Sequence, residues 1–423
     1  MKRTTYFLVS VAAAAVIAAC GNGEEASPPA TSTAVVTLQA TPEETLGAES
    51  GPLSQEAPTE GAYLIDLAAG RWTRVLPTHQ EFPPFAAISP DGETIVYRDE
   101  NGLVAADIDG ADQRRIAEAG IDPWRYPSAA FSPDGETLAI WGASEGAALT
   151  LLPWPDGEPL PVELPESVHY AAWSGDVLAV GTGPRGFGDV NAVYFVSPDG
   201  RAVQVPNLIP AGYRPFVLAP DQRRLTLWVR AAAGSVVLTL APGEEPQRLV
   251  ELPGQGIGGL SWSSDGALLA AVVQRPSQSD PNSSDADVQV IDTATGALRF
   301  TVTSAGGAAW SPALPLLLMD NFCGDFQQLL VDADGSDLRP LIADPQRGGL
   351  EHPWSPDGRR VATTWEGTVT AIDVESGERE TLIRGPQAFN LQWPTADHLV
   401  FNTIGAAGFC EDTVRGETRV VFP

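Results

Sequence analysis

The feature that most constrains this chain is a short turn motif that returns at nearly regular intervals. Its full form, a large apolar residue followed by Ser-Pro-Asp-Gly, occurs at Ile88–Gly92, Phe131–Gly135 and Trp354–Gly358, and Trp262–Gly266 differs from it at one residue. Weaker copies complete a set of eight, whose lead residues are 88, 131, 173, 218, 262, 310, 354 and 393, so the motif recurs every 39 to 48 residues. A repeat of this kind points to one structural unit used eight times.

The residues around each motif are those of two antiparallel strands joined by a tight turn. In the unit of Phe131, the apolar stretches Ser128–Phe131 and Thr137–Trp141 flank the turn. Proline sets φ, aspartate caps the turn through its side chain, and glycine takes the positive-φ position. Two more strands follow in each unit, as in a β-propeller blade. The sequence therefore predicts an all-β, eight-bladed β-propeller of four-stranded antiparallel blades.

The two ends of the repeat region indicate how the ring closes. Residues 62–76 have no motif before them and match the outer two strands that we expect at 369–383, whereas the last motif, at Trp393, is followed by one further strand only. We expect N- and C-terminal strands to share one blade, because this pairing removes an exposed sheet edge. The tail 418–422 is an alternative further strand of that blade.

Residues 1–20 have the features of a targeting segment. Lys2 and Arg3 precede an apolar stretch at 6–19 that is short for a membrane-spanning helix. The residues at 17–20 resemble the lipobox of bacterial lipoproteins, which implies a signal peptide cleaved before Cys20 and a lipid on the thiol of that residue. The alternative is an ordinary signal peptide. We expect a lipid anchor to the membrane through Cys20 and a location in the cell envelope, extracytoplasmic or periplasmic.

The segment that follows differs in composition from the repeats. Residues 21–60 are rich in Ala, Pro, Ser, Thr and Glu and have few large apolar side chains, so we expect a disordered tether there. The propeller would then occupy residues 61–423. The net charge of −29 becomes −31 once Lys2 and Arg3 are removed, and such acidity disfavours nucleic acid as a partner.

The remaining cysteines predict one disulfide. Cys323 and Cys410 each follow the second strand of their units, so both loops lie on the same face of the ring. Pairing is favoured outside the cytoplasm, and two unrelated free thiols are the alternative.

Once the repeats are assembled, a resemblance to known families is visible. The Ser-Pro-Asp-Gly turns and the stretch Leu330–Arg339 are similar to the WD40-like repeats of TolB-type propellers, and the eight-fold count resembles the propeller of the dipeptidyl peptidase IV family. The resemblance covers residues 61–423. It implies the fold, but this architecture serves many unrelated functions.

Catalytic and metal sites have little support in the sequence. Gly142–Gly146 matches GxSxG with Ser144 at its centre, but no helix and no α/β-hydrolase domain follow it. The four histidines lack metal-site spacing, and the alternating acids Asp332, Asp334 and Asp337 lack the final glutamate of a calcium loop. We therefore expect no catalytic residues, no metal and no cofactor.

A candidate binding site follows from the loops that lead into each inner strand, because these surround the axis on one face. The residues four to six places before the motif serines are aromatic or charged in several blades, whereas blades five and six have Gly258, Gly259, Gly306 and Gly307. We take the following residues as the lining of this funnel: Arg125, Tyr126, His169, Tyr213, Arg214, Glu351 and His352. Their alternative role is to pack the loops. Arginines among them would select a carboxylate or similar anionic group.

These observations predict a monomeric, non-catalytic module that binds an unknown protein, peptide or glycan ligand. The alternative is a propeller hydrolase or lactonase, because the sites of such enzymes are assembled from several blades and leave no compact motif.

The anchor prediction is tested by Cys20→Ser. Without the thiol there is no acceptor for the lipid, so the precursor should stay uncleaved and unlipidated. Metabolic labelling with a radioactive fatty acid and the size of the mature chain measure this. Normal labelling and processing of the variant would contradict the prediction.

Overall fold

The structure is a computed structural model of the chain. It describes residues 49–58, 60–76, 85–99, 101–118, 128–142, 148–184, 190–208, 217–231, 233–276, 284–320, 328–341, 354–365, 367–386, 388–403 and 419–422. The predicted disulfide and lipidation sites, Cys323, Cys410 and Cys20, lie outside these residues. Within them, no helix is long and apolar enough to cross a membrane.

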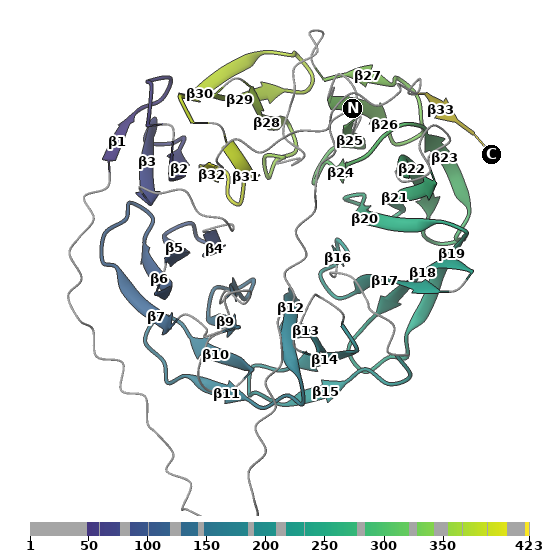
Figure 1. The fold of residues 1–423 in the computed structure, drawn as a ribbon, viewed down its shortest axis with the longest axis horizontal. Helices are drawn as coiled ribbons and strands as arrows, with labels where there is room; N and C mark the ends of the chain where they lie inside the picture. Colours follow the sequence, from purple (N-terminus) through teal and green to yellow (C-terminus); the bar gives the residue numbers. More distant parts are fainter. Residues whose placement is uncertain are drawn as a thin grey trace, which may run out of the picture. The chain divides into compact units, whose positions relative to one another are not determined.

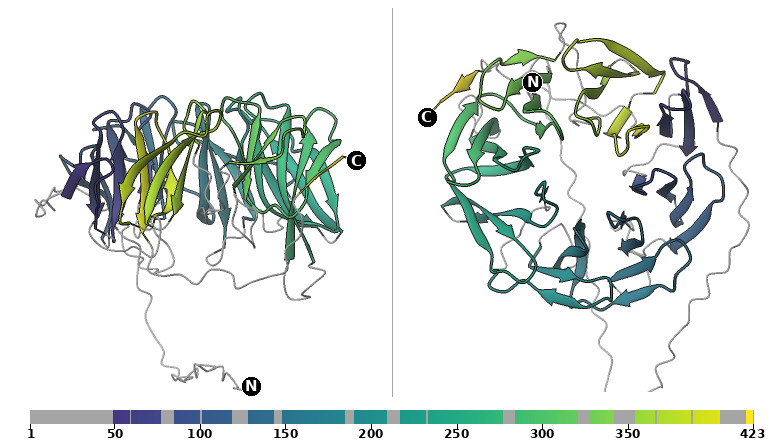
Figure 2. Two further views of the ribbon diagram at one scale, coloured as in Figure 1. Left: turned by 90° about the horizontal axis from the view of Figure 1, so that it is seen from above. Right: turned by 180° about the vertical axis from the view of Figure 1, so that it is seen from behind.

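Eight antiparallel sheets are arranged in a ring around a central axis, as Figure 1 shows. Seen from the side, the sheets form a disc whose thickness is the length of the strands (Figure 2). Counted over the described residues, five sheets have four strands, two have a fifth strand, and one has three strands and a single bridge. The predicted eight-bladed β-propeller is thereby confirmed.

Blades one to six follow each other along the chain, and each runs from the axis to the rim (Figure 1). Blades one to three are β4 (Phe85–Ile88), β5 (Thr94–Asp99), β6 (Gly102–Asp107), β7 (Arg114–Glu118); β8 (Ser128–Phe131), β9 (Thr137–Trp141), β10 (Leu149–Pro153), β11 (Leu160–Val162); and β12 (Ser167–Ser174), β13 (Val177–Gly183), β14 (Ala192–Val196), β15 (Ala202–Gln204). Blades four to six are β16 (Val217–Leu218), β17 (Leu225–Ala231), β18 (Gly234–Leu240), β19 (Gln247–Pro253); β20 (Gly256–Trp262), β21 (Leu268–Pro276), β22 (Ser284–Asp292), β23 (Leu298–Val302); and β24 (Ala308–Trp310), β25 (Leu316–Asp320), β26 (Gln328–Asp332), β27 (Arg339–Pro340).

Blades seven and eight complete the ring. Blade seven has β28 (Arg360–Trp365), β29 (Thr368–Asp373) and β30 (Arg379–Arg384), and Trp354 bridges to Val361 at the position of its inner strand. Blade eight has β31 (Ala388–Gln392), β32 (His398–Thr403), β2 (Ala62–Asp66) and β3 (Arg71–Leu76), in this order from the axis to the rim, with β32 paired to β2. Strands from both ends of the chain therefore share this blade, as predicted.

The C-terminal tail belongs to a different blade from the one considered in the sequence. β33 (Val420–Val421) pairs with β23 at the rim of blade five, and the rings of Phe422 and Phe300 lie 6.1 Å apart. The alternative placement of the tail in blade eight is thus wrong. The rim strand of blade five leaves an edge that the tail covers, and sequence periodicity carries no signal for a two-residue strand.

The motif turns are held by a repeated hydrogen-bond pattern. In blade seven, the Ser355 hydroxyl donates to Asp357 at 2.6 Å and accepts from the Arg360 N–H at 2.9 Å. The motif serines Ser89, Ser132 and Ser263 donate to their aspartates in the same way, at 2.5 to 2.7 Å. These hydrogen bonds lower the pKa values of Asp91, Asp134, Asp265 and Asp357.

Two of the lead tryptophans are hydrogen-bonded to the inner strand of the blade before their own. The indole N–H of Trp173 donates to the carbonyl of Ala130 at 3.0 Å, and Trp354 does the same to Ala309. Both acceptors lie on the inner strand of the preceding blade. The motif thus both forms a turn and fixes the contact between neighbours.

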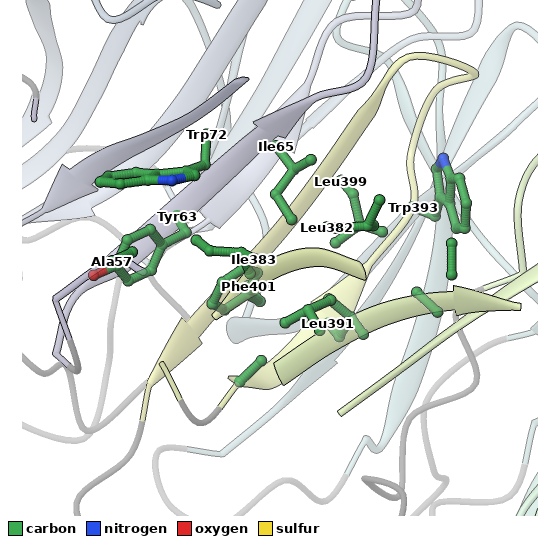
Figure 3. Close-up of a cluster of buried hydrophobic side chains, with 14 residues drawn as sticks. Ala57, Tyr63, Ile65, Trp72, Leu382, Ile383, Leu391, Trp393, Leu399 and Phe401 are labelled. Atoms are coloured by element: carbon green, nitrogen blue, oxygen red, sulfur yellow. The ribbon is translucent and has the colours of Figure 1, made fainter. Parts of the chain in front are cut away.

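The closing blade is packed against blade seven by a large apolar cluster (Figure 3). Tyr63 stacks on Phe401 at 5.1 Å between ring centroids and meets Trp72 edge-on at 6.0 Å. Leu382 and Ile383 of β30 enter the same cluster. Strands from opposite ends of the chain thus share one core.

Residues 49–57 form a strap over the rims of blades seven and eight. β1 (Glu49–Pro52) pairs with β3, and the chain then crosses to β30, where Ser54 N–H donates to Leu382 O at 3.0 Å and Ala57 N–H to Arg384 O at 2.7 Å. Ala57 is 6% exposed within the cluster described above. The sequence placed these residues in the tether 21–60 and began the propeller at 61. In the structure, backbone hydrogen bonds to the edges of β3 and β30 order residues 49–57, although their hydrophobicity is low.

The strap requires a glycine on blade seven. Gly385 has φ of +106°, and a Cβ added there would lie 2.2 Å from the Ala57 carbonyl oxygen. We expect Gly385→Ala to lower the free energy of unfolding by about 2–4 kcal/mol, since the backbone penalty of roughly 1–2 kcal/mol is joined by displacement of the strap.

Gly377→Ala is the matched control for this variant. Gly377 also has positive φ, at +71°, but no atom lies within 4 Å of its added Cβ, so only the backbone penalty applies. Urea unfolding of both variants, in chains that begin at residue 47 or at residue 59, measures the difference. An equal cost of the two substitutions in the longer chain would show that the strap contributes nothing.

The motif carboxylates predict acid sensitivity of a defined sign. Because the folded pKa of Asp357 lies below its unfolded value of about 3.9, its stabilising effect is complete above that value and is lost as the pH falls through the folded pKa. Ser355→Ala should cost about 1–2 kcal/mol at pH 7, with a smaller difference from wild type at pH 3. Ser174→Ala is the control, because the Ser174 hydroxyl donates to the Gln222 carbonyl, which does not titrate. A cost of Ser355→Ala that is the same at both pH values in urea unfolding would contradict this account.

Candidate functional site

The topology defines two unlike faces of the ring. Each inner strand runs toward its motif turn, so the motif turns lie on one face. The starts of the inner strands and the ends of the second strands lie on the other, which we call the funnel face. The described strand ends that flank the loops selected from the sequence lie on the funnel face.

Of the seven predicted funnel residues, the structure describes one. His169 lies on β12, is partly exposed, and its Nε2 atom is 3.1 Å from the carbonyl oxygen of Pro184 at the end of β13. The other six lie outside the described residues: Arg125, Tyr126, Tyr213, Arg214, Glu351 and His352. Their place in the funnel stays a prediction.

Bulges occur at the funnel ends of several inner strands. In β12 the pairing skips from Val168 to Tyr170, which leaves His169 as the extra residue. In β20 it skips from Ile257 to Gly259, which leaves Gly258 in the same role. β4 and β31 have similar shifts of register. Since a bulge redirects a side chain from the regular alternation of a strand, His169 is presented differently from its neighbours.

The glycine side of the funnel is held in place by a buried carboxylate. Asp320, at the end of β25 and 4% exposed, accepts the N–H of Gly307 through Oδ1 at 2.7 Å, and its carbonyl accepts the N–H of Gly306 at 2.7 Å. Gly306 and Gly307 are partly exposed, and Gly258 is exposed. The two glycine segments therefore present main chain rather than side chains to the funnel face.

A cation that the sequence did not suggest lies on the opposite side of the funnel. Arg98, near the end of β5, donates to the Ser128 hydroxyl at 2.8 Å, and Ser128 is the first residue of the neighbouring inner strand β8. Burial lowers the pKa of Arg98 to about 10, so the guanidinium remains charged at neutral pH. The available signal was a charged residue at the end of the apolar run Ile95–Tyr97.

An ion pair stands beside this arginine. Arg115 donates to both oxygens of Asp99, at 2.9 and 2.8 Å. Burial works to raise the pKa of Asp99, but the hydrogen bonds from Arg115 and from the N–H groups of Asn101 and Gly102 outweigh it, and the pKa is lowered. A bidentate pair of this kind fixes the end of β5, and with it the position of Arg98.

Of the residues considered for catalysis and for calcium binding, the structure describes the acids of the turn but not Ser144. Ser144 lies outside the described residues. In the turn of the acids considered for calcium, Asp334 accepts from the Ser336 N–H and hydroxyl, and Asp337 pairs with Arg339 at 2.7 Å. Groups of three or more His, Cys, Asp or Glu side chains suited to a metal ion do not occur among the described residues.

Comparison with known proteins relates the chain to others by fold. No family model and no curated protein matches it. Among solved structures, the Dos1 propeller is similar over 81% of this chain and 95% of that chain, with a TM-score of 0.54 and 13% identity. Dihydro-heme d1 dehydrogenase NirN, solved in complex with DHE, is similar over 79% and 75%, with a TM-score of 0.51 and 17% identity. A prolyl endopeptidase structure is similar over 68% and 48%, with a TM-score of 0.46 and 14% identity. Identities this low show a shared β-propeller fold and nothing of its ligands.

Proposed function

We propose that the protein is a lipid-anchored lipoprotein of the cell envelope whose propeller binds a protein, peptide or glycan ligand at its funnel face, without catalysis. The anchor rests on the lipobox resemblance at Cys20. The observation that carries the binding role is the asymmetry of the funnel face. One side has Arg98 and the redirected His169, and the other presents the main chain of Gly258, Gly306 and Gly307.

The charge of the site supports an anionic group on the ligand. The chain has 54 acidic and 25 basic residues, so most of its surface repels anions. Arg98 places a positive charge at the funnel end of blade one. A guanidinium in a partly buried setting binds a carboxylate more strongly than one in water, because both groups are less solvated there.

The proposal is tested by capturing the ligand from the native envelope with the tagged mature protein, followed by affinity measurements on variants. Arg125→Ala combined with Arg214→Ala should weaken binding at least tenfold, equivalent to about 1.4 kcal/mol, while leaving the thermal midpoint nearly unchanged.

The control is Arg223→Ala combined with Arg379→Ala, which removes the same charge from exposed positions in a motif turn of blade four and on β30. If both double variants bind with unaltered affinity, the ligand docks away from the funnel. Turnover of a captured substrate would instead favour the hydrolase alternative.

A further inference from the structure

Blade six has a glutamine where the other blades have an aliphatic residue. In each blade, one residue of the second strand lies opposite the lead residue of the motif, and the position in question pairs with the residue three places further along that second strand. In the other blades it is occupied by a residue that is 0% exposed: Leu103, Leu149, Val193, Val237, Val288, Val369 and Ala62. In blade six it is Gln328, which is 3% exposed and pairs with Asp320. Packing alone does not require an amide there, since aliphatic side chains serve in seven equivalent places.

The amide of Gln328 is buried and unsatisfied. Neither Nε2 nor Oε1 has a hydrogen-bond partner. A buried polar group without a partner is costly, and most such groups in proteins are paired with protein or with a bound species. The presence of an amide side chain at position 328 is therefore not explained by the packing of the fold.

The alternation of the strands shows what Gln328 faces. Leu330, two residues along β26, and Leu318, two residues before Asp320, belong to the apolar cluster with Trp354 and Val361 of blade seven. Residues two apart in a strand share a face, so Gln328 and Asp320 both face blade seven. Directly paired residues on one face have Cβ atoms about 5 Å apart, which places the carboxylate beside the amide.

Blade seven contributes a third polar residue to the same interface. Thr363 lies two residues after Val361 in β28, so it faces blade six, and it is 5% exposed. Its counterparts at this position are Tyr97, Ile140, Val180, Leu227, Ala271, Met319 and Phe401. Two departures from the repeated pattern, on two different blades, thus occur at one interface, beside the carboxylate of Asp320.

We propose that Asp320, Gln328 and Thr363 form an inter-blade binding site for a hard metal cation. Carboxylate, carboxamide and hydroxyl oxygens are the ligands that such cations take. With Oε1 of Gln328 on the cation, its amino group can donate to the Asp320 carboxylate. The three described side chains carry one negative charge together, which a monovalent cation such as sodium neutralises. Calcium is the alternative cation, because it takes the same oxygen ligands, and it would complete its coordination shell with water.

The first test is the thermal midpoint of the full-length protein in sodium chloride, in calcium chloride and in N-methylglucamine chloride with a chelator, at equal ionic strength. A cation that binds only the folded protein stabilises it in a saturable way. We expect a rise with sodium or calcium over the organic cation, and the arm that responds identifies the ion. No response to either metal would overturn the proposal, including the case in which a buried water satisfies Gln328.

The second test replaces Gln328 by leucine, the residue that blades one and two have at the equivalent position. Gln328→Leu should lower the midpoint in the responding salt and abolish the response, because the variant loses a ligand. Were the amide simply unsatisfied, Gln328→Leu would raise the midpoint in every salt, which would overturn the proposal.

Two further variants guard against a general effect on folding. Thr363→Val keeps the shape of the side chain and should weaken the cation response without abolishing it. Leu149→Gln places an amide at the equivalent position of blade two, and should lower the midpoint equally in all salts. The cation site lies between blades six and seven and does not involve a ligand at the funnel. Its tests are therefore independent of the tests of the proposed binding function.

Discussion

The structure depends on the contact that each blade makes with the next. A four-stranded sheet has two faces, and in a closed ring both are buried only when neighbouring blades cover them. The large apolar lead residue of the motif enters this interface, and in blades three and seven the N–H of a lead tryptophan also donates to the preceding inner strand, as Trp173 does to Ala130. The same five-residue motif closes the turn through Ser and Asp. One short sequence thus specifies both the local bend and the place of its blade in the ring.

A ring assembled from repeats must also secure the two ends of the chain, and here both ends cover sheet edges. Blade eight combines β31 and β32 with β2 and β3, so opening the ring would separate strands that are paired in register. The strap then covers the rims of blades seven and eight, and β33 covers the rim of blade five. Exposed edges are sites of unwanted pairing between chains. In the part of the chain that the structure describes, residues outside the repeats therefore protect the rims of blades five, seven and eight.

The number of blades, their strand order and the shared closing blade were predictable because they follow from a period and from turn chemistry, both of which are local. The strap was not, because residues 49–57 look disordered by composition and are ordered by distant backbone partners on β3 and β30. The Ser-Pro-Asp-Gly motif alone does not show which two strands of a blade its turn connects. Ser197–Gly200 has the full Ser-Pro-Asp-Gly sequence and the same 2.7 Å bond from Ser197 to Asp199, yet it joins the third and fourth strands of blade three. In the candidate site, counting from the motif serine found His169, whereas Arg98 and Asp320 were missed because their roles depend on which sheet face they occupy.

The approximate symmetry of the propeller supplies a comparison that single folds lack. Eight equivalent positions share nearly the same backbone and the same neighbours, so the residue that recurs among them shows what packing requires. Gln328 departs from the pattern set by Leu103, Leu149 and five other aliphatic residues, so a requirement other than packing must explain it. A single departure is readily tolerated in a protein of this size. The departures at Gln328 and Thr363 are different in kind, because they lie on two blades and meet, beside Asp320, only where blade seven packs against blade six. Such a coincidence is expected when the polar atoms share an occupant, and it is visible only from the pairing register.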